Sequence, residues 1–343
     1  MPEPARVPNA SRVCRTCQRE LPATEEYFRP CPPGPLGISG LLRGECRRCG
    51  NGAVRARRIA NSEVARAARS HEPKAAFRPR LVGEGGKDSD GYTERLDGGY
   101  RFVCLPDSHG HLIDWKAAEA ALAFVRYYRP VRIYLLGDHV DFTGLSRFVV
   151  SPRERASVPE DIAEGRKFFA RVRESAPDAA ILYLKGNHEA RLRRYTYTNA
   201  AALDGLAGLD VPNLLGLADH GIEWEESGSH MATERLVVKH GNMVRQRSGY
   251  TATGELERNG VSGISGHTHR LGQVFKRNRL GMMTWVESGC LCRYDPVYME
   301  GQLSDWQQGL SYGTVDLKGN GFSVSVAPIV NGRVRCGDRE IGS

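Results

Sequence analysis

The segment VRIYLLGDHVD (131–141) joins a short apolar run to a glycine and two carboxylates. Apolar runs of this length that end at Gly or Asp are typical of buried β-strands. Four further segments have the same form: YRFVCLPD (100–107), AAILYLKGN (179–187), RLVVKHGN (235–242) and VSGISGH (261–267). Helix-like segments at 114–129 and 159–176 separate the first three strands. This βαβαβ order predicts an α/β domain.

Potential metal ligands follow each of the predicted strands. They are Asp107 and His109, Asp138 and Asp141, Asn187 and His188, His240, and His267 and His269. In open α/β sheets, sites form in the crevice at the carboxyl ends of the strands, so these side chains should converge. Strand alternation would point His267 and His269 to the same side. Taken alone, that pair fits two polar residues on a hydrated strand face equally well, but the recurrence at five strand ends favours a shared site.

Five short blocks occur in a fixed order along the chain: DSH (107–109), GDHVD (137–141), GNHE (186–189), KHGN (239–242) and GHTH (266–269). Together they resemble the motif set of the calcineurin-like metallophosphoesterase family. The resemblance implies an α/β fold in which a sandwich of two mixed β-sheets is flanked by helices. The chain also becomes β-rich after residue 275, since 281–291, 310–318 and 322–330 read as strands, and we expect these to build the second sheet.

The resemblance implies that seven of these residues hold two metal ions. One ion would be bound by Asp107, His109, Asp138 and His269, and the other by Asp138, Asn187, His240 and His267, with Asp138 bridging. A mixed nitrogen and oxygen donor set suits Mn, Fe, Ni or Zn, and its composition does not choose among them. In the same family pattern, His188 stays off the metals. It either protonates the leaving alkoxide or stabilises charge on the phosphoryl group, while Asp141 orients its ring.

The charge of such a centre indicates the substrate class. Two dications with the carboxylates Asp107 and Asp138 leave a net charge of about +2, which attracts anions such as phosphate esters. Because metal ions lower the pKa of water, we expect a metal-bound hydroxide to attack phosphorus directly, without a covalent enzyme intermediate. Our leading expectation is a phosphodiesterase or nuclease. The alternatives are a phosphomonoesterase acting on small molecules or phosphoproteins, and a non-catalytic metal-binding scaffold of the same fold.

Two CxxC pairs, Cys14 with Cys17 and Cys46 with Cys49, lie near the N-terminus in a segment with little apolar pattern. Four thiolates around one structural Zn²⁺ would replace the missing core. Free thiols, or partial ligation through Cys31, are the alternatives. The segment resembles the small zinc ribbons of tailed-phage and prophage proteins, and it lacks the histidine cluster of an HNH nuclease.

Basic residues are concentrated in the N-terminal part of the chain. Residues 1–80 hold 16 Lys and Arg against 7 Asp and Glu, whereas the remainder holds 32 against 33. A basic segment on a near-neutral body suggests contact with a polyanion such as DNA or RNA. Alternatively, the charge keeps a small module soluble. We expect three parts: a zinc-ribbon-like module with four cysteine ligands at 1–50, a basic helix and linker at 51–97, and a metallophosphoesterase domain at 98–343.

The sequence contains no run of about 18 apolar residues and no apolar signal core at its N-terminus. We therefore expect a cytoplasmic protein without a membrane partner, located in the host cytoplasm if a phage encodes it. No pattern in the chain indicates an oligomeric state.

Several other residues near the motifs admit two interpretations. His111 and His139 are expected in solvent-facing or supporting positions. Arg191, Arg193 and Arg194, on the predicted helix after GNHE, either reach substrate phosphates or form a solvated helix face.

The remaining cysteines and two tryptophans are expected to serve packing. Cys104 lies within a predicted strand, and Cys290 and Cys292 either pack or line the rim of the site. Trp285 and Trp306 are expected to pack in the core or at an edge rather than to stack on nucleobases.

Overall fold

The computed structural model describes residues 11–15, 17–23, 26–30, 42–46, 99–147, 157–279, 281–295, 303–316 and 321–342. The chain divides into two compact units, Met1–Ala76 and Phe77–Ser343. The basic helix and linker predicted at 51–97 lie outside the described residues.

The first large sheet has eight strands in the order β17-β16-β15-β14-β5-β6-β7-β8. Their bounds are β5 Gly99–Leu105, β6 Arg132–Leu135, β7 Ala180–Leu184, β8 Ile222–Glu225, β14 Gly309–Asp316, β15 Gly321–Val330, β16 Arg333–Cys336 and β17 Arg339–Ile341. The strands β5 to β8 run parallel, and the other neighbours pair antiparallel. The first three predicted strands are therefore β5, β6 and β7, and their carboxyl ends lie at one edge of the sheet.

The second large sheet has five strands in the order β12-β13-β11-β10-β9. Their bounds are β9 Ser229–Thr233, β10 Leu236–Lys239, β11 Ser262–Ser265, β12 Leu271–Asn278 and β13 Gly281–Ser288. The central strands β10, β11 and β13 are parallel, and the edge strands β9 and β12 pair antiparallel. The expected sandwich of two mixed sheets is confirmed.

The prediction that the strands after residue 275 build the second sheet is correct only for β13. The strands β14 and β15 belong to the first sheet instead, where β14 pairs with β5 along most of its length. The physical reason is that β5 has one edge covered by β6 and one edge left to pair, and an antiparallel partner can satisfy its backbone groups from any distance in sequence.

Alternation along the strands of the first sheet separates two hydrophobic cores. Val103 and Leu135 belong to the core that contains the side chains of α2 (Trp115–Tyr128) and α3 (Val158–Ser175). Their neighbours Cys104 and Leu136 belong to the core shared with the second sheet. Burial on both faces explains why these strands read as continuous apolar runs in the sequence.

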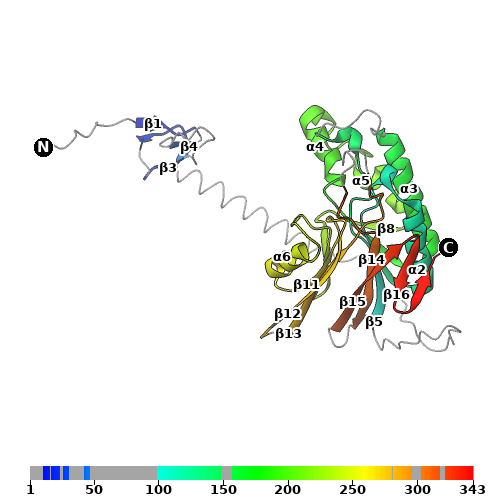
Figure 1. The fold of residues 1–343 in the computed structure, drawn as a ribbon. Helices are drawn as coiled ribbons and strands as arrows, with labels where there is room; N and C mark the ends of the chain where they lie inside the picture. The colour runs from blue at the N-terminus through cyan, green and yellow to red at the C-terminus, as the bar shows by residue number, and fades with distance from the viewer. Residues whose placement is uncertain are drawn as a thin grey trace. The chain divides into compact units, whose positions relative to one another are not determined.

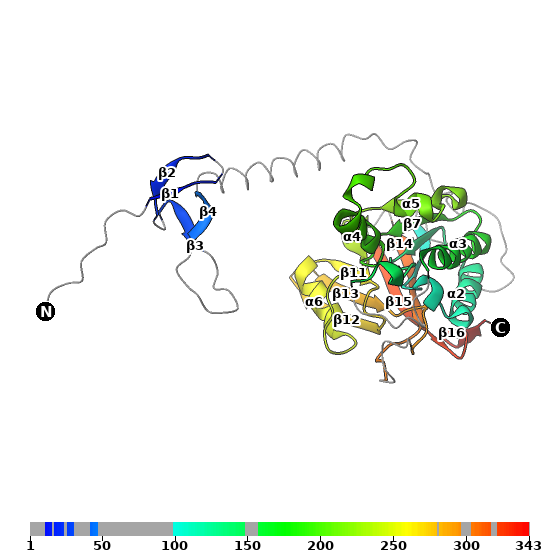
Figure 2. The ribbon, with the colours of Figure 1, turned by 90° about the horizontal axis from the view of Figure 1, so that it is seen from above.

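A third core lies on the outer face of the second sheet. There, Ala252 and Leu256 of α6 (Tyr250–Asn259) pack against Val237 and the fully buried Trp285. The packing role expected for Trp285 is confirmed. The result is a four-layer arrangement with α2 and α3 on one side, the two sheets in the middle and α6 on the other side (Figure 1, Figure 2).

Helix ends in this unit are stabilised by side chains. The carboxylate of Asp114 accepts hydrogen bonds from two backbone N–H groups at the start of α2, and Ser157 with Glu160 forms a capping box at the start of α3. The other helices are η1 Gly110–Leu112, η2 Thr143–Leu145, α4 Glu189–Asn199, η3 Ala201–Leu203, α5 Val211–Leu214 and η4 Leu217–His220.

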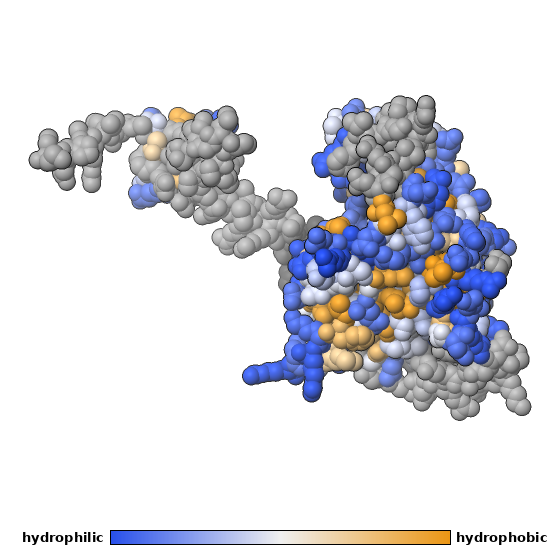
Figure 3. All heavy atoms as spheres, viewed as in Figure 1, coloured by the Kyte–Doolittle hydropathy of each residue, from blue (hydrophilic) through white to orange (hydrophobic). Residues whose placement is uncertain are grey.

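The surface of this unit is mixed in polarity. In the view of Figure 3, hydrophobic residues come to the surface in small patches among hydrophilic ones. Such a surface is ordinary for a globular domain.

In the N-terminal unit, the described residues form four short strands, β1 Ser11–Val13, β2 Glu20–Pro22, β3 Phe28–Pro30 and β4 Leu42–Cys46. They form two antiparallel pairs, β1 with β2 and β3 with β4. Its described core consists of Cys14, Phe28 and Cys46 with Leu21 beside them.

Within the described ranges, no helix is long and apolar enough to cross a membrane.

A buried carboxylate holds the loop after β6 against the loop after β7. Glu189 is 1% exposed and accepts hydrogen bonds from the backbone N–H groups of Gly186, Asp138, His139 and Val140. The Tyr183 hydroxyl donates a fifth at 2.6 Å. These bonds fix the turn that carries Asp138 relative to the turn that carries GNHE.

We predict that Glu189→Gln lowers the free energy of unfolding of the metal-free protein by about 3 kcal/mol, because an amide N–H would face backbone donors. Urea titration of the protein in chelator measures this change. The matched control is Glu174→Gln, whose side chain is 69% exposed and which should change stability by less than about 0.5 kcal/mol. Equal effects of the two substitutions would contradict the bracing role of Glu189.

Candidate metal centre

The predicted ligands lie in turns at the ends of β5, β6, β7, β10 and β11. Four of them have left-handed backbone conformations: His109 (φ 55), Asp138 (φ 51), His267 (φ 71) and His269 (φ 58). This region is uncommon for residues other than glycine and is concentrated at functional sites. The expectation that His267 and His269 continue a strand is wrong, since β11 ends at Ser265. Both imidazoles are instead directed by the turn.

The first group of donors consists of Asp107, His109 and His269, all buried. The Nε2 atoms of His109 and His269 lie 2.9 Å apart, and His269 Nε2 lies 3.6 Å from Asp107 Oδ1. The carboxylate of Asp107 also accepts hydrogen bonds from the backbone N–H of His267, at 3.0 and 3.1 Å. Three donor atoms therefore face one point.

The second group consists of Asp138, His240 and His267, with Asn187 beside it. His240 Nε2 lies 3.3 Å from Asp138 Oδ2 and 3.0 Å from Asn187 Oδ1. The rings of His240 and His267 are 5.0 Å apart between centroids. His240 Nδ1 lies 2.8 Å from the Leu136 carbonyl oxygen, to which an Nδ1–H would donate, so Nε2 is the nitrogen that faces the site.

The seven predicted ligands thus lie in two groups: Asp107, His109 and His269 form the first, and Asp138, His240 and His267, with Asn187 beside them, form the second. The donor chemistry fits divalent cations. Ligand atoms bound at about 2.1 Å to an octahedral ion lie roughly 3 Å apart along each edge. The separations of 2.9, 3.0 and 3.3 Å between facing donors are close to that value.

Two glycines allow the loops to approach these carboxylates. A Cβ atom at Gly266 would lie 2.4 Å from Asp107 Oδ2, and one at Gly186 would lie 2.1 Å from Asp138 Oδ1. Neither distance is compatible with a side chain. The glycines in GNHE and GHTH are therefore required by close backbone approach.

The site concentrates opposite charges away from water. Burial alone would raise the pKa of Asp107, but the nearby imidazoles of His269 and His240 lower it to about 2. Burial alone would lower the pKa of His240, but the charge of Asp138 raises it to about 10. In the metal-free protein, the imidazolium of His240 therefore compensates for the buried carboxylates.

His188 and Asp141 are in contact at the edge of this centre. His188 Nδ1 lies 2.9 Å from Asp141 Oδ1, which also lies 2.9 Å from His109 Nδ1. Burial opposes the charge on His188, but Asp138 and Asp141 raise its pKa overall. The His188 Nε2 atom is 3.7 Å from Asp138 Oδ2, and the ligand atoms of His188, His109 and Asp138 lie within 4.8 Å of one another.

Two further histidines near the motifs, His111 and His139, support the loops from behind. His139 is fully buried, and its Nδ1 lies 2.9 Å from Ser108 Oγ while its ring stacks on Phe168. A solvent-facing position is thus excluded for His139. The Nδ1 and backbone N–H of His111 both lie 3.1 Å from Oδ1 of buried Asp161.

The cysteines and tryptophan near the site take different positions. Cys104 is buried in the core between the sheets, as expected. Cys290 and Cys292 are buried beside the candidate metal centre, and Cys292 Sγ lies 3.9 Å from His269 Nδ1. Trp306 contacts the His269 ring edge to face, with centroids 4.3 Å apart. Trp306 therefore packs against a predicted ligand.

Two carboxylates that position the site were missed by sequence reasoning. Glu189 is one, and Glu287 is the other. Glu287 is fully buried and accepts hydrogen bonds from Thr268 Oγ1 at 2.8 Å and from the Gly249 backbone N–H at 2.7 Å. It thereby ties the GHTH turn to the start of α6. The signal available in the sequence was an acidic residue at the end of an apolar run, in WVES (285–288).

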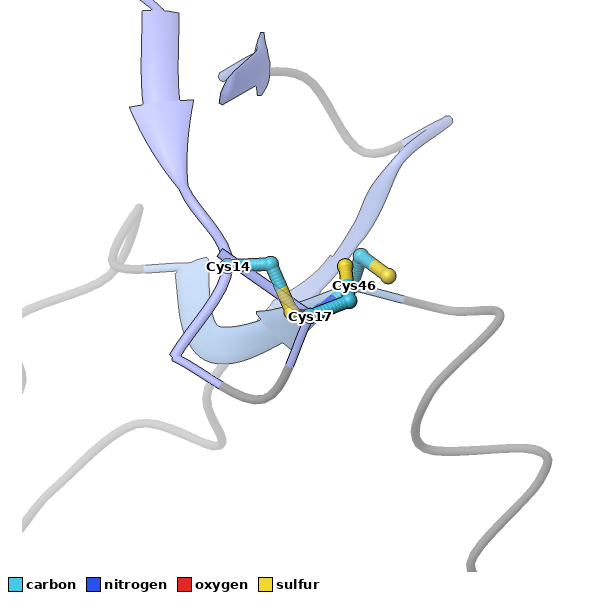
Figure 4. A group of neighbouring side chains, drawn as sticks. All are labelled: Cys14, Cys17 and Cys46. Atoms are coloured by element: carbon cyan, nitrogen blue, oxygen red, sulfur yellow. Dashed lines mark hydrogen bonds between the residues drawn. The ribbon is translucent and has the colours of Figure 1, made fainter. Parts of the chain in front are cut away.

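A separate group of thiols lies in the N-terminal unit. Cys14, Cys17 and Cys46 lie together, with their sulfur atoms within 4.8 Å of one another (Figure 4). The backbone N–H of Cys46 also donates to Cys14 Sγ at 3.3 Å. Cys49, the fourth predicted zinc ligand, and Cys31, the alternative ligand, lie outside the described residues.

The fold and site together define an α/β sandwich that carries, at its strand ends, groups of side chains that could hold metal ions. No family model matches the chain. Its sequence is similar to the Gene 54 protein of Mycobacterium phage L5, with 27% identity over 247 residues, covering 68% of this chain and 95% of that protein. The Gene 54 protein of Mycobacterium phage D29 is 28% identical over the same length and coverage.

Among solved structures, the chain is similar to Vps29 from Chaetomium thermophilum, with a TM-score of 0.33 and 11% identity over 71% of this chain and 93% of that one. It is also similar to a phosphatase from Mycoplasma pneumoniae, with a TM-score of 0.31 and 12% identity over 71% of this chain and 95% of that one.

We predict that Mn²⁺ binding at pH 7 releases about one proton from His240, because its pKa of about 10 keeps Nε2 protonated in the metal-free protein. Affinity for Mn²⁺ should consequently increase as pH increases. Calorimetry in two buffers with different ionisation enthalpies counts the protons. The control is His240→Gln, which keeps a donor atom without a titrating group, and identical proton counts for both proteins would exclude His240 as the source.

Proposed function

We propose that this protein is a dinuclear metal-dependent phosphoester hydrolase. The observation that carries the proposal is the convergence of seven donor side chains from five strand ends into two adjacent groups. In this proposal, the residues of the first group and those of the second each hold one divalent ion, and Asp138 binds both. The five motif blocks in the sequence support the same assignment.

The ions, when bound, would supply positive charge to a phosphoryl group and lower the pKa of water toward neutral. The residues of the chain then have separate tasks. Asp141 accepts from His109 and His188 and so fixes the orientation of both rings. His188, at the rim, is placed to hold or deliver a proton at Nε2 where the leaving oxygen departs.

We further propose a phosphodiester in nucleic acid as the substrate. The support is the basic composition of segment 1–80 and the group of thiols, Cys14, Cys17 and Cys46, that this segment contains. In this proposal, Cys14, Cys17, Cys46 and Cys49 bind one structural zinc ion. Similarity to two phage proteins is consistent with a location in a host cytoplasm.

Two alternatives to a nucleic-acid phosphodiesterase can be distinguished by experiment. A phosphomonoesterase would use the same centre and would not need the basic segment. A metal-binding scaffold would keep the ions but hydrolyse no ester. The complete donor set and the presence of His188 favour an enzyme over a scaffold.

We predict that the wild-type protein holds two active-site ions and one zinc ion, and that Asp138→Asn loses the former pair. Hydrolysis of bis-p-nitrophenyl phosphate by this variant should decrease at least about a hundredfold. The matched variant is Cys14→Ser, which should lose zinc but keep hydrolysis. Elemental analysis and the hydrolysis assay measure both effects, and a fully active Asp138→Asn protein would contradict the bridging assignment.

A second prediction concerns the substrate. Removal of residues 1–97 should leave hydrolysis of bis-p-nitrophenyl phosphate within about twofold but weaken nucleic-acid binding. The dependence of binding on salt should become less steep because fewer counterions are released. The assay panel contains single-stranded and duplex DNA, RNA, cyclic nucleotides and phosphomonoesters. Unchanged nucleic-acid binding, or a preference for monoesters, would support the phosphomonoesterase instead.

A further inference from the structure

Three arginines at the start of α4 have different environments. Arg193 has a 56% exposed side chain and pairs with Glu226 at 2.7 Å, away from the donor groups. Arg194 donates to the Asn187 carbonyl oxygen at 2.9 Å. The side chain of Arg191 is only 17% exposed and turns toward the rim of the metal centre.

Two contacts anchor one end of the Arg191 guanidinium. Its Nη1 donates to the carbonyl oxygen of Asp141 at 2.7 Å and to Asp141 Oδ2 at 3.1 Å. Asp141 is itself 6% exposed and is held by His109 and by the hydroxyl of Thr143. The position of Nη1 is therefore fixed by a residue that belongs to the site.

The other end of the guanidinium is directed at the proposed proton donor. Arg191 Nη2 lies 3.2 Å from His188 Nε2. A guanidinium has no acceptor, so in this contact Nη2 donates to the lone pair of the imidazole. His188 Nε2 in turn lies 3.7 Å from Asp138 Oδ2. A fixed cation thus faces the same point as His188, beside the carboxylate assigned to both ions.

The shape and charge of this group suit a phosphoryl oxygen. A guanidinium is always charged and presents planar donors that match the oxygens of phosphate. The side chains of Arg191 and His188 are 17% and 15% exposed, so both reach solvent at the rim. By contrast, the carboxylate of Glu189, on the same helix, is buried and serves only to brace the loops.

We propose that Arg191 is a substrate-binding residue that donates through Nη2 to a non-bridging oxygen of the phosphoryl group. This inference rests on the proposed phosphoesterase function. When the phosphoryl group enters, Nη2 exchanges His188 Nε2 for the phosphoryl oxygen. The exchange frees the lone pair of His188 Nε2, which takes up a proton from solvent at the rim and then gives that proton to the leaving oxygen.

The test uses the full-length, Mn²⁺-loaded protein with the variants Arg191→Ala, Arg191→Lys and, as a control from the same helix, Arg193→Ala. Arg191→Ala should reduce kcat/KM for bis-p-nitrophenyl phosphate about a hundredfold and weaken inhibition by inorganic phosphate. Millimolar guanidinium should restore part of the activity of Arg191→Ala and should not affect Arg193→Ala. Arg191→Lys should retain an intermediate rate, because it keeps the charge but loses the planar geometry.

Two results would overturn the proposal. One is activity and phosphate inhibition of Arg191→Ala equal to those of Arg193→Ala. The other is loss of bound Mn²⁺ in both Arg191 variants without rescue by guanidinium. That result would mean that Arg191 stabilises the site structure and does not bind the substrate. If the wild type hydrolyses no ester, the proposed function fails separately. In that case, calorimetry measures the binding of inorganic phosphate to the Mn²⁺-loaded wild type and Arg191→Ala proteins. Weaker binding by Arg191→Ala would support the inference, and equal binding would overturn it.

Discussion

Burial of the two carboxylates Asp107 and Asp138 is the constraint on which the rest of the domain depends. Each is at most 1% exposed, and isolated charges in such surroundings are costly. The fold compensates with imidazoles delivered from distant strand ends, above all His240, whose pKa is raised to about 10. Metal ions would replace those protons. A centre of this kind is assembled only when both sheets are in place, because its ligands come from β5, β6 and β7 in one sheet and from β10 and β11 in the other.

The backbone around the centre is shaped to make this assembly possible. Left-handed turns at His109 and Asp138 are held by bonds between loops, such as the one from the His109 N–H to the Asp138 carbonyl oxygen at 2.9 Å. Glu189 and Glu287 hold the turns from behind. Two buried carboxylates outside the predicted ligand set thus stabilise the loops that carry the predicted ligands.

The sequence was sufficient to predict the strands that end in ligands, because burial on both faces leaves uninterrupted apolar runs such as 131–136. It was also sufficient to identify the residues of the candidate site, through five motif blocks. It could not reveal that β14 pairs with β5, since ladder partners distant in sequence leave no local pattern. For helix α4, the sequence predicted a helix after GNHE but not its first and last residues. The reason is that its sequence EARLRRYTYTN lacks an apolar stripe. The turn conformation of His267 and the distinct positions of the three arginines depend on tertiary contacts.

The pairing of β14 with β5 also affects how the chain reaches its native state. Ser311 lies opposite Cys104, so the strand synthesised first in this domain has an unpaired edge until nearly the whole chain has left the ribosome. Pairing across such a distance is slow, and an uncovered central strand is prone to associate with other chains in the meantime. A ribosome-bound nascent chain that stops before β14 is therefore the species in which this domain is most exposed to aggregation and to chaperone binding.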